Sequence, residues 1–191
     1  SLCVMAVMLF FTATGARSGN MTLAVNALFM QLYLLYSHFM DGFAYAGEAL
    51  VGKYAGAADK HSLRRCVSHL FAWGWSLAAI FAFAYGVFNH EVMSLFSDKP
   101  EVVAFAAAYR WWIALAPIAG MAAFIWDGVF VGLTATRQML LSLAGATAVY
   151  FAIYFLSPFP DANSSLWTAF LTYLAVRGVI LWLCFARKNE Y

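Results

Sequence analysis

The chain has 191 residues, of which 64% are hydrophobic and only 10% are charged, whereas a soluble domain is about 25% charged. Its 18 Phe, 10 Tyr and 7 Trp are too many to bury in one small soluble core. The net charge of +2, with no block of like charges, argues against a nucleic-acid partner. The composition therefore predicts a protein whose solvent is the lipid bilayer.

Six stretches are apolar enough to be candidates for membrane-spanning helices, which need about 20 mainly apolar residues. None of them alternates in the manner of a membrane β-barrel strand. We therefore predict an all-α membrane protein, a bundle of six transmembrane helices, in which the first span is short and the second and fourth are long. The predicted spans, in chain order, cover residues 1–15, 23–57, 67–88, 103–134, 139–157 and 165–185.

The loops between these spans predict the orientation, because basic residues are retained on the cytoplasmic side. The loop after the second span has four basic residues within 53–65, and Arg137 and Arg187 follow the fourth and sixth spans. The opposite loops are mostly acidic, although the first of them carries Arg17. We therefore predict a multi-pass protein with both ends of this segment in the cytoplasm.

Two further features lie between and within the later spans. The stretch HEVMSLFSDK, residues 90–99, is amphipathic and is predicted to lie along the outer membrane surface. Pro117 falls inside the fourth span and is predicted to kink it, because proline cannot donate the intrahelical hydrogen bond.

Several residues that are charged at neutral pH fall inside predicted spans. Arg110, near the outer end of the fourth span, is expected to snorkel to the interface. Four others need a further explanation, and His38 lies close to two of them. A charge at the bilayer centre costs at least roughly 2.5–3.5 kcal/mol, so such residues face the bundle interior or water and are functional candidates. The four are Asp41, Glu48, Asp127 and Arg177.

Asp41 and Glu48 are seven residues apart, which places them on one face of the second span. His38, Ala44 and Tyr45 belong to the same stripe, whose small residues favour either close helix contact or a lining of water. For Asp41 we favour ion coupling or substrate contact. Glu48 lies near the cytoplasmic boundary, where an interfacial carboxylate is an equal alternative, and for Tyr45 we favour packing against a neighbouring helix.

Arg177 near the middle of the last span requires a partner. One hypothesis is an ion pair with Asp127 or Asp41, and the alternative is that it caps backbone carbonyls or snorkels to the interface. Desolvation and a nearby arginine act in opposite directions on the protonation of a carboxylate, so proton or sodium release can depend on hydration. Asp127-Gly128 also repeats the Asp41-Gly42 dipeptide late in a long helix, as an internal repeat would.

Three stretches resemble one transporter family: NALFMQLYLLYSHFMDGFAYAGEALVGKYAGAADKHSLRR, WDGVFVGLTATRQM and LAVRGVILW. The chain resembles the multidrug and toxic compound extrusion (MATE) family, in its DinF-like branch, over its whole length. That resemblance implies twelve helices in two lobes, with residues 1–191 forming the C-terminal six-helix lobe. The partner would be an N-terminal six-helix lobe, which we expect upstream in the same native chain.

The resemblance also implies an activity and a site. Such a protein would be no enzyme but an antiporter of a bacterial inner membrane, exchanging lipophilic or cationic compounds for H⁺ or Na⁺, with no other cofactor. Asp127 matches the acidic cation-site residue on the family's helix ten. The matching glutamate of helix seven has no counterpart within residues 1–14, and the best-known coupling aspartate of the DinF-like branch belongs to helix one, outside this sequence.

Two other interpretations have different signatures. A membrane-embedded enzyme would need a catalytic cluster, and the pair His90-Glu91 lacks the second histidine of the HExxH zinc motif. A six-helix homodimeric half-transporter, or a non-transporting membrane subunit, is compatible with six spans and two cytoplasmic ends, and the mass of the native polypeptide would distinguish it.

Overall fold

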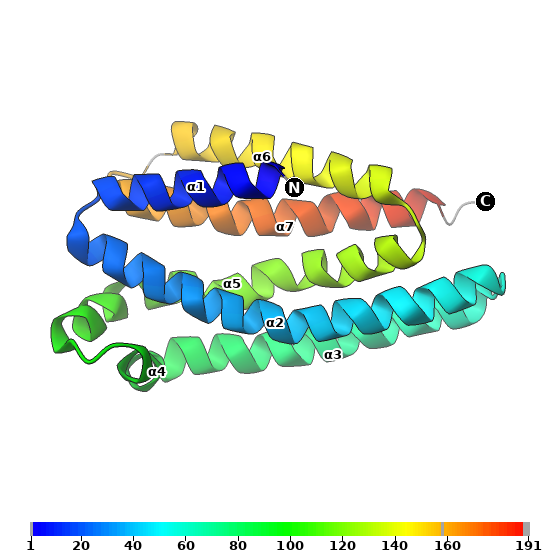
Figure 1. The fold of residues 1–191 in the computed structure, drawn as a ribbon, viewed down its shortest axis with the longest axis horizontal. Coiled ribbons are helices and arrows are strands. Elements are labelled where there is room, and N and C mark those ends of the chain that lie inside the picture. Colours follow the sequence, from blue (N-terminus) through cyan, green and yellow to red (C-terminus); the bar gives the residue numbers. More distant parts are fainter. Residues whose placement is uncertain (1, 158, 189–191) are drawn as a thin grey trace.

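The computed structural model describes residues 2–157 and 159–188, and this part of the chain contains helices and no strand. The long helices run side by side and form an elongated bundle (Figure 1). The elements are α1 (Leu2–Arg17), α2 (Asn20–Gly56), α3 (Lys60–Val87), α4 (Asn89–Phe96), α5 (Pro100–Gly132), α6 (Thr136–Leu156) and α7 (Ala162–Lys188).

Five of these helices, α2, α3, α5, α6 and α7, are long and apolar enough to cross a membrane. The all-α prediction is thus confirmed for the described residues. The first predicted span is also an apolar helix, but α1 has 16 residues, fewer than the roughly 20 that a crossing requires. The number of six spans therefore stays a prediction.

The five long helices begin before the corresponding predicted spans, because hydrophobicity detects only the part of a helix that lies in lipid. The clearest case is α3, which begins at Lys60 rather than at residue 67. Asp59 caps this helix: its carboxylate Oδ1 accepts a hydrogen bond from the Ser62 backbone N–H at 3.0 Å. The amphipathic stretch before the fourth long helix forms α4, and its position at the membrane surface stays a prediction.

The buried side chains form two clusters along the bundle. The first, which we call the aromatic core, lies towards the α1–α2 turn and unites five long helices around fully buried rings. Phe11 and Phe29 both contact Trp167 edge to face, with ring centroids 5.1 and 5.8 Å apart. Its most deeply buried rings are Phe11, Phe29, Tyr150, Trp167, Phe170 and Tyr173.

The second cluster, which we call the hairpin core, lies towards the turn between α2 and α3. Here α2 and α5 approach closely at glycines. A Cβ atom added to Gly132 would lie 2.6 Å from the Glu48 carbonyl oxygen, and one added to Gly128 would overlap the Ala44 carbonyl group. Gly128 and Gly132 have the GxxxG spacing that lets two membrane helices pack backbone against backbone. Close helix contact is therefore what the small residues of α2 provide at this point.

Candidate functional site

An ion pair connects α5 and α7 inside the bundle. Arg177 donates a hydrogen bond from Nη2 to Oδ2 of Asp127 over 2.5 Å. The Arg177 and Asp127 side chains are 14% and 29% exposed, so the pair is shielded but still reachable. The sequence left Asp127 and Asp41 open as ion-pair partners of Arg177. In the structure the partner is Asp127, and Asp41 is not part of the pair.

The pair does not use all of its hydrogen-bonding capacity. Oδ1 of Asp127 and Nε of Arg177 are both buried without a hydrogen-bond partner in the described part of the chain. An unsatisfied buried polar atom loses its hydration without compensation, which makes it a favourable place for a proton, an ion or a water molecule to bind. The free oxygen of Asp127 is thus a candidate ligand for a small cation.

Aromatic hydroxyls and a second carboxylate surround this pair. The Arg177 guanidinium carbon lies 5.8 Å from the centre of the Tyr173 ring, within the range of a cation–π contact. The Tyr173 hydroxyl is also buried without a partner among the described residues. Asp41 of α2 is close enough to interact electrostatically with both Asp127 and the buried Tyr33. The site therefore draws on α2, α5 and α7.

The other predicted residues of α2 do not join this cluster. Asp41 is partly buried, whereas the side chains of His38 and Glu48 are exposed on the outer surface of the chain. Tyr45 is 70% exposed, so the expected packing against a neighbouring helix is not found within this chain. The stripe is thus divided between Asp41, which interacts electrostatically with Asp127, Ala44, which abuts Gly128 of α5, and three exposed residues.

Pro117 lies within α5, which continues through it as one helix. The fully buried Tyr36 donates a hydrogen bond to the Pro117 carbonyl over 3.0 Å and so ties α2 to this point of α5. The predicted kink stays a prediction. The contact shows, however, that a side chain of a neighbouring helix binds the backbone of α5 at its proline.

Sequence reasoning missed a second polar cluster, which joins α2 to α7 within the aromatic core. The Asn26 amide donates to Oδ1 of Asn163 over 2.7 Å and accepts a hydrogen bond from Nε1 of Trp167 over 2.9 Å. All three side chains are buried. Asparagines in or beside apolar runs were the available signal, but attention to charged residues alone passes over neutral amides.

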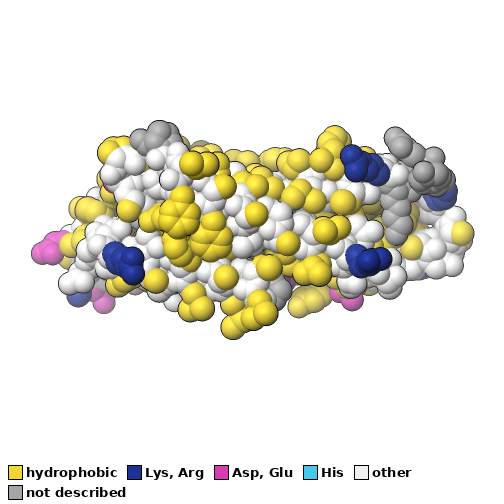
Figure 2. Space-filling model, turned by 90° about the horizontal axis from the view of Figure 1, so that it is seen from above, with side chains coloured by type: hydrophobic (Ala, Val, Ile, Leu, Met, Phe, Trp, Pro, Cys, Tyr) yellow, Lys and Arg dark blue, Asp and Glu magenta, His cyan; other side chains and the backbone are white. Residues whose placement is uncertain are grey.

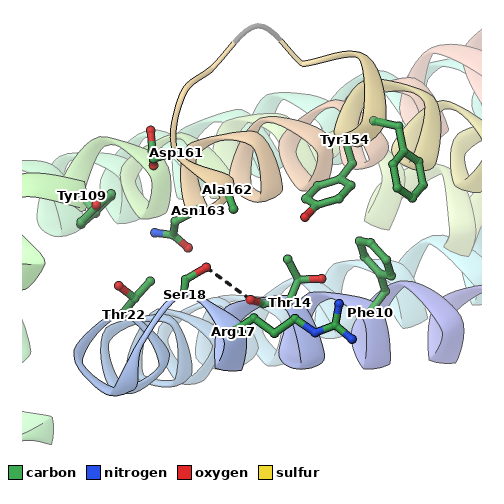
Figure 3. Close-up of a pocket in the computed structure, with 11 residues that line it drawn as sticks. Phe10, Thr14, Arg17, Ser18, Thr22, Tyr109, Tyr154, Asp161, Ala162 and Asn163 are labelled. Atoms are coloured by element: carbon green, nitrogen blue, oxygen red, sulfur yellow. Dashed lines mark hydrogen bonds between the residues drawn. The ribbon is translucent and has the colours of Figure 1, made fainter.

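A cavity of about 650 Å³ opens beside this amide cluster (Figure 3). Figure 3 shows Thr14, Arg17, Ser18 and Thr22 on one side and Asp161, Ala162 and Asn163 on the other. None of the residues predicted for the site lines it. On the face drawn in Figure 2, hydrophobic side chains cover the middle of the molecule and basic side chains lie towards its two ends.

The apolar helices and the partly exposed ion pair between them define a multi-pass membrane protein with a polar site inside the bundle. The family model MatE matches residues 1–156, and the chain therefore belongs to the MatE family. The resemblance stated from the sequence is thereby confirmed.

Three curated relatives match most of this chain. It is 32% identical over 170 residues to DNA damage-inducible protein F of Escherichia coli (strain K12), covering 89% of this chain and 37% of that protein. It is 24% identical over 179 residues to Protein DETOXIFICATION 45, chloroplastic, of Arabidopsis thaliana, covering 94% of this chain and 32% of that protein. It is 25% identical over 167 residues to Protein DETOXIFICATION 43 of the same plant, covering 87% of this chain and 32% of that protein. The chain spans about a third of the length of these relatives.

Proposed function

We propose that the chain is the C-terminal part of an antiporter that exports lipophilic or cationic compounds in exchange for H⁺ or Na⁺. Membership of the MatE family and the similarity to DNA damage-inducible protein F support this proposal. The proposed location is a bacterial inner membrane, with the α2–α3 turn and both ends of this segment in the cytoplasm. The proposal includes no enzymatic step.

The observation that carries the proposal is the ion pair of Asp127 and Arg177. A charged pair inside a membrane is costly, and such pairs mark ion pathways more often than they stabilise a fold. Here the carboxylate has one oxygen in the pair and one buried oxygen that has no partner among residues 2–157 and 159–188. A proton or Na⁺ that binds Asp127 competes directly with Arg177 for the same negative charge.

Arg177 has a second favourable contact when a cation takes its place at Asp127. The Tyr173 ring already lies within cation–π distance of the guanidinium group. Cation binding would thus move Arg177 from the carboxylate towards the ring and loosen the contact between α5 and α7. Alternating access, in this proposal, uses that change, and Asp41 adds a second negative charge that attracts the cation.

The test is gradient-driven export by the full-length protein in proteoliposomes, measured with a proton gradient and a sodium gradient separately. Because the neutral Asn side chain binds neither cation as a carboxylate does, Asp127→Asn should lower coupled export at least about tenfold, as the loss of a required proton-transfer group does. Asp161→Asn, outside the spans, is the matched control. Wild-type export by Asp127→Asn would assign the pair a structural role only.

The proposed partner of this segment is an N-terminal six-helix lobe in the same native polypeptide. The length of the curated relatives supports it, because the chain matches about a third of each. A tag after the last residue at the chromosomal locus would give the mass of the native product. A mass well above the 21.1 kDa of this chain is expected, and a product of 21.1 kDa would favour a half-transporter or a subunit.

A further inference from the structure

The groove between α2 and α3 near their common turn has no part in the proposed transport. It encloses about 530 Å³. Its lining residues recur at three- and four-residue intervals, so each helix contributes a single face. The main ones are Phe43, Leu50 and Tyr54 from α2 and Ser62, Arg65 and Trp73 from α3.

The groove changes from polar to apolar along its length. Near the turn it is lined by the hydroxyl-bearing Tyr54 and Ser62, the guanidinium group of Arg65 and the imidazole of His69. Arg65 and His69 are four residues apart on α3 and therefore lie on the same side of the helix. Both side chains are exposed, so a ligand can reach them from the membrane surface.

The far end of the groove is apolar and open. Phe43 lines it from α2, and Trp73, which is 67% exposed, lines it from α3. From Ser62 to Trp73 the helix rises about 16 Å at 1.5 Å per residue. That length equals about half of the roughly 30 Å hydrocarbon core, the depth of one leaflet.

The charges around the polar end select the sign of the ligand. The segment from Lys53 to His69 holds Lys53, Lys60, Arg64 and Arg65 against the single acid Asp59. A basic cluster next to membrane-spanning helices attracts anionic lipid, by an amount that grows with each added Lys or Arg. Arginine also binds phosphate oxygens through two parallel hydrogen bonds.

We propose that this groove binds one anionic phospholipid of the phosphatidylglycerol type. Its phosphate contacts Arg65 and His69, the Ser62 and Tyr54 hydroxyls contact the glycerol headgroup, and an acyl chain lies along Leu50 and Trp73. A zwitterionic lipid adds a positive headgroup next to the same basic side chains and binds more weakly. The binding is independent of the Asp127–Arg177 pair, so failure of one proposal leaves the other standing.

The experiment measures lipid retained by the full-length protein, purified in detergent and titrated with phosphatidylglycerol or with phosphatidylcholine of the same acyl chains, by native mass spectrometry. The double variant Arg65→Gln/His69→Gln should weaken phosphatidylglycerol binding about fivefold or more, because losing one basic side chain near the membrane surface lowers the affinity for anionic lipid by about fivefold. Arg137→Gln, an exposed arginine outside the groove, is the matched control and should bind as the wild type does.

A second measurement reports the acyl end and does not depend on the charge variant. Phosphatidylglycerol brominated in its chains should quench tryptophan fluorescence, and Trp73→Phe should remove most of the component that quenches at low lipid concentration. Equal binding of both lipids by the wild type would overturn the proposal. So would unchanged phosphatidylglycerol binding by Arg65→Gln/His69→Gln, or displacement of the bound lipid by millimolar inorganic phosphate alone.

Discussion

The aromatic core and the hairpin core join their helices in different ways. In the aromatic core, large rings and one amide cluster fill the space between α1, α2, α5, α6 and α7. In the hairpin core, α2 and α5 touch through glycines with almost no side chain between them. The ion pair of Asp127 and Arg177 lies beside this glycine contact, since Asp127 directly precedes Gly128.

This difference indicates where the bundle is fixed and where it carries a polar function. Trp167 donates a hydrogen bond to Asn26 in a region filled with rings, although Nδ2 of Asn163 there has no partner among the described residues. Asp127 and Arg177 also have atoms without partners in the described part of the chain, but they are charged and lie in a partly exposed region. The aromatic core should therefore be sensitive to the removal of side-chain volume. The hairpin core should be sensitive to added volume and to the loss of one charge.

The largest expected effect comes from emptying the aromatic core. Trp167→Ala removes a fully buried ring and its hydrogen bond to Asn26, and should lower the free energy of unfolding by about 4 kcal/mol. Trp182→Ala on the same helix, where the ring is 55% exposed, should cost only about 0.5 kcal/mol. Unfolding of the full protein in mixed micelles measures both. Equal losses would mean that α7 is not anchored by this core.

The next effect comes from adding a single methyl group to the hairpin core. In Gly128→Ala the new Cβ meets backbone atoms of Ala44, which cannot rotate away, so the variant should lose about 3 kcal/mol. The control is Gly42→Ala, where an added Cβ meets nothing within 4 Å. It should gain roughly 0.5–1 kcal/mol from the better helix former. The comparison fails if Gly128→Ala is as stable as the wild type.

A smaller effect is expected from breaking the ion pair. Arg177→Gln leaves the Asp127 charge without its partner and should cost about 2 kcal/mol, less than for a fully buried pair because this one is partly exposed. Adding Asp127→Asn removes the lone charge and should restore most of the stability. A double-variant cycle in mixed micelles measures the coupling, and simple additivity of the two losses would contradict a direct interaction.

The smallest effect lies at the end of the hairpin, outside the membrane-spanning helices. Hydrogen bonds from the Ser62 side chain and backbone lower the pKa of the Asp59 carboxyl below its ordinary value. A lowered pKa stabilises the fold above the ordinary pKa of about 3.9, and that stabilisation is lost as the pH falls through the folded value. Asp59→Ala should therefore lower Tm slightly at pH 7. If the difference from wild type persisted under strongly acidic conditions, the charge of Asp59 would not be its cause.

The sequence predicted the long apolar helices, but not how helices distant in the chain meet. Asp41 and Asp127 each precede a glycine in a long helix, so local sequence could not decide which of them pairs with Arg177. The two glycines also differ: Gly128 abuts α2, whereas Gly42 faces open space. Asp41 differs from Asp127, and Gly42 from Gly128, only in how α2, α5 and α7 are aligned along one another. That alignment depends on packing over the whole bundle.

The missed features share a second cause. Hydropathy and charge detect what a residue costs in lipid, not which partner satisfies it. Asn26 is a mildly polar residue in an apolar stretch, and nothing near it in sequence indicates Asn163 or Trp167. Hydropathy likewise does not indicate where α3 begins, because the first turns of this helix are polar and depend on the Asp59 cap.

The glycine contact between α2 and α5 also bears on how the protein is made. The ribosome completes α2, α3 and α4 before α5 emerges, so the surface of α2 at Ala44 and Glu48 must first meet lipid or the insertion machinery. Its contact partner, the backbone of α5 at Gly128 and Gly132, has not yet been synthesised at that stage. The nascent chain therefore carries an open docking face, with Asp41 close by, until α5 arrives, and insertase or chaperone dependence should be greatest in that interval.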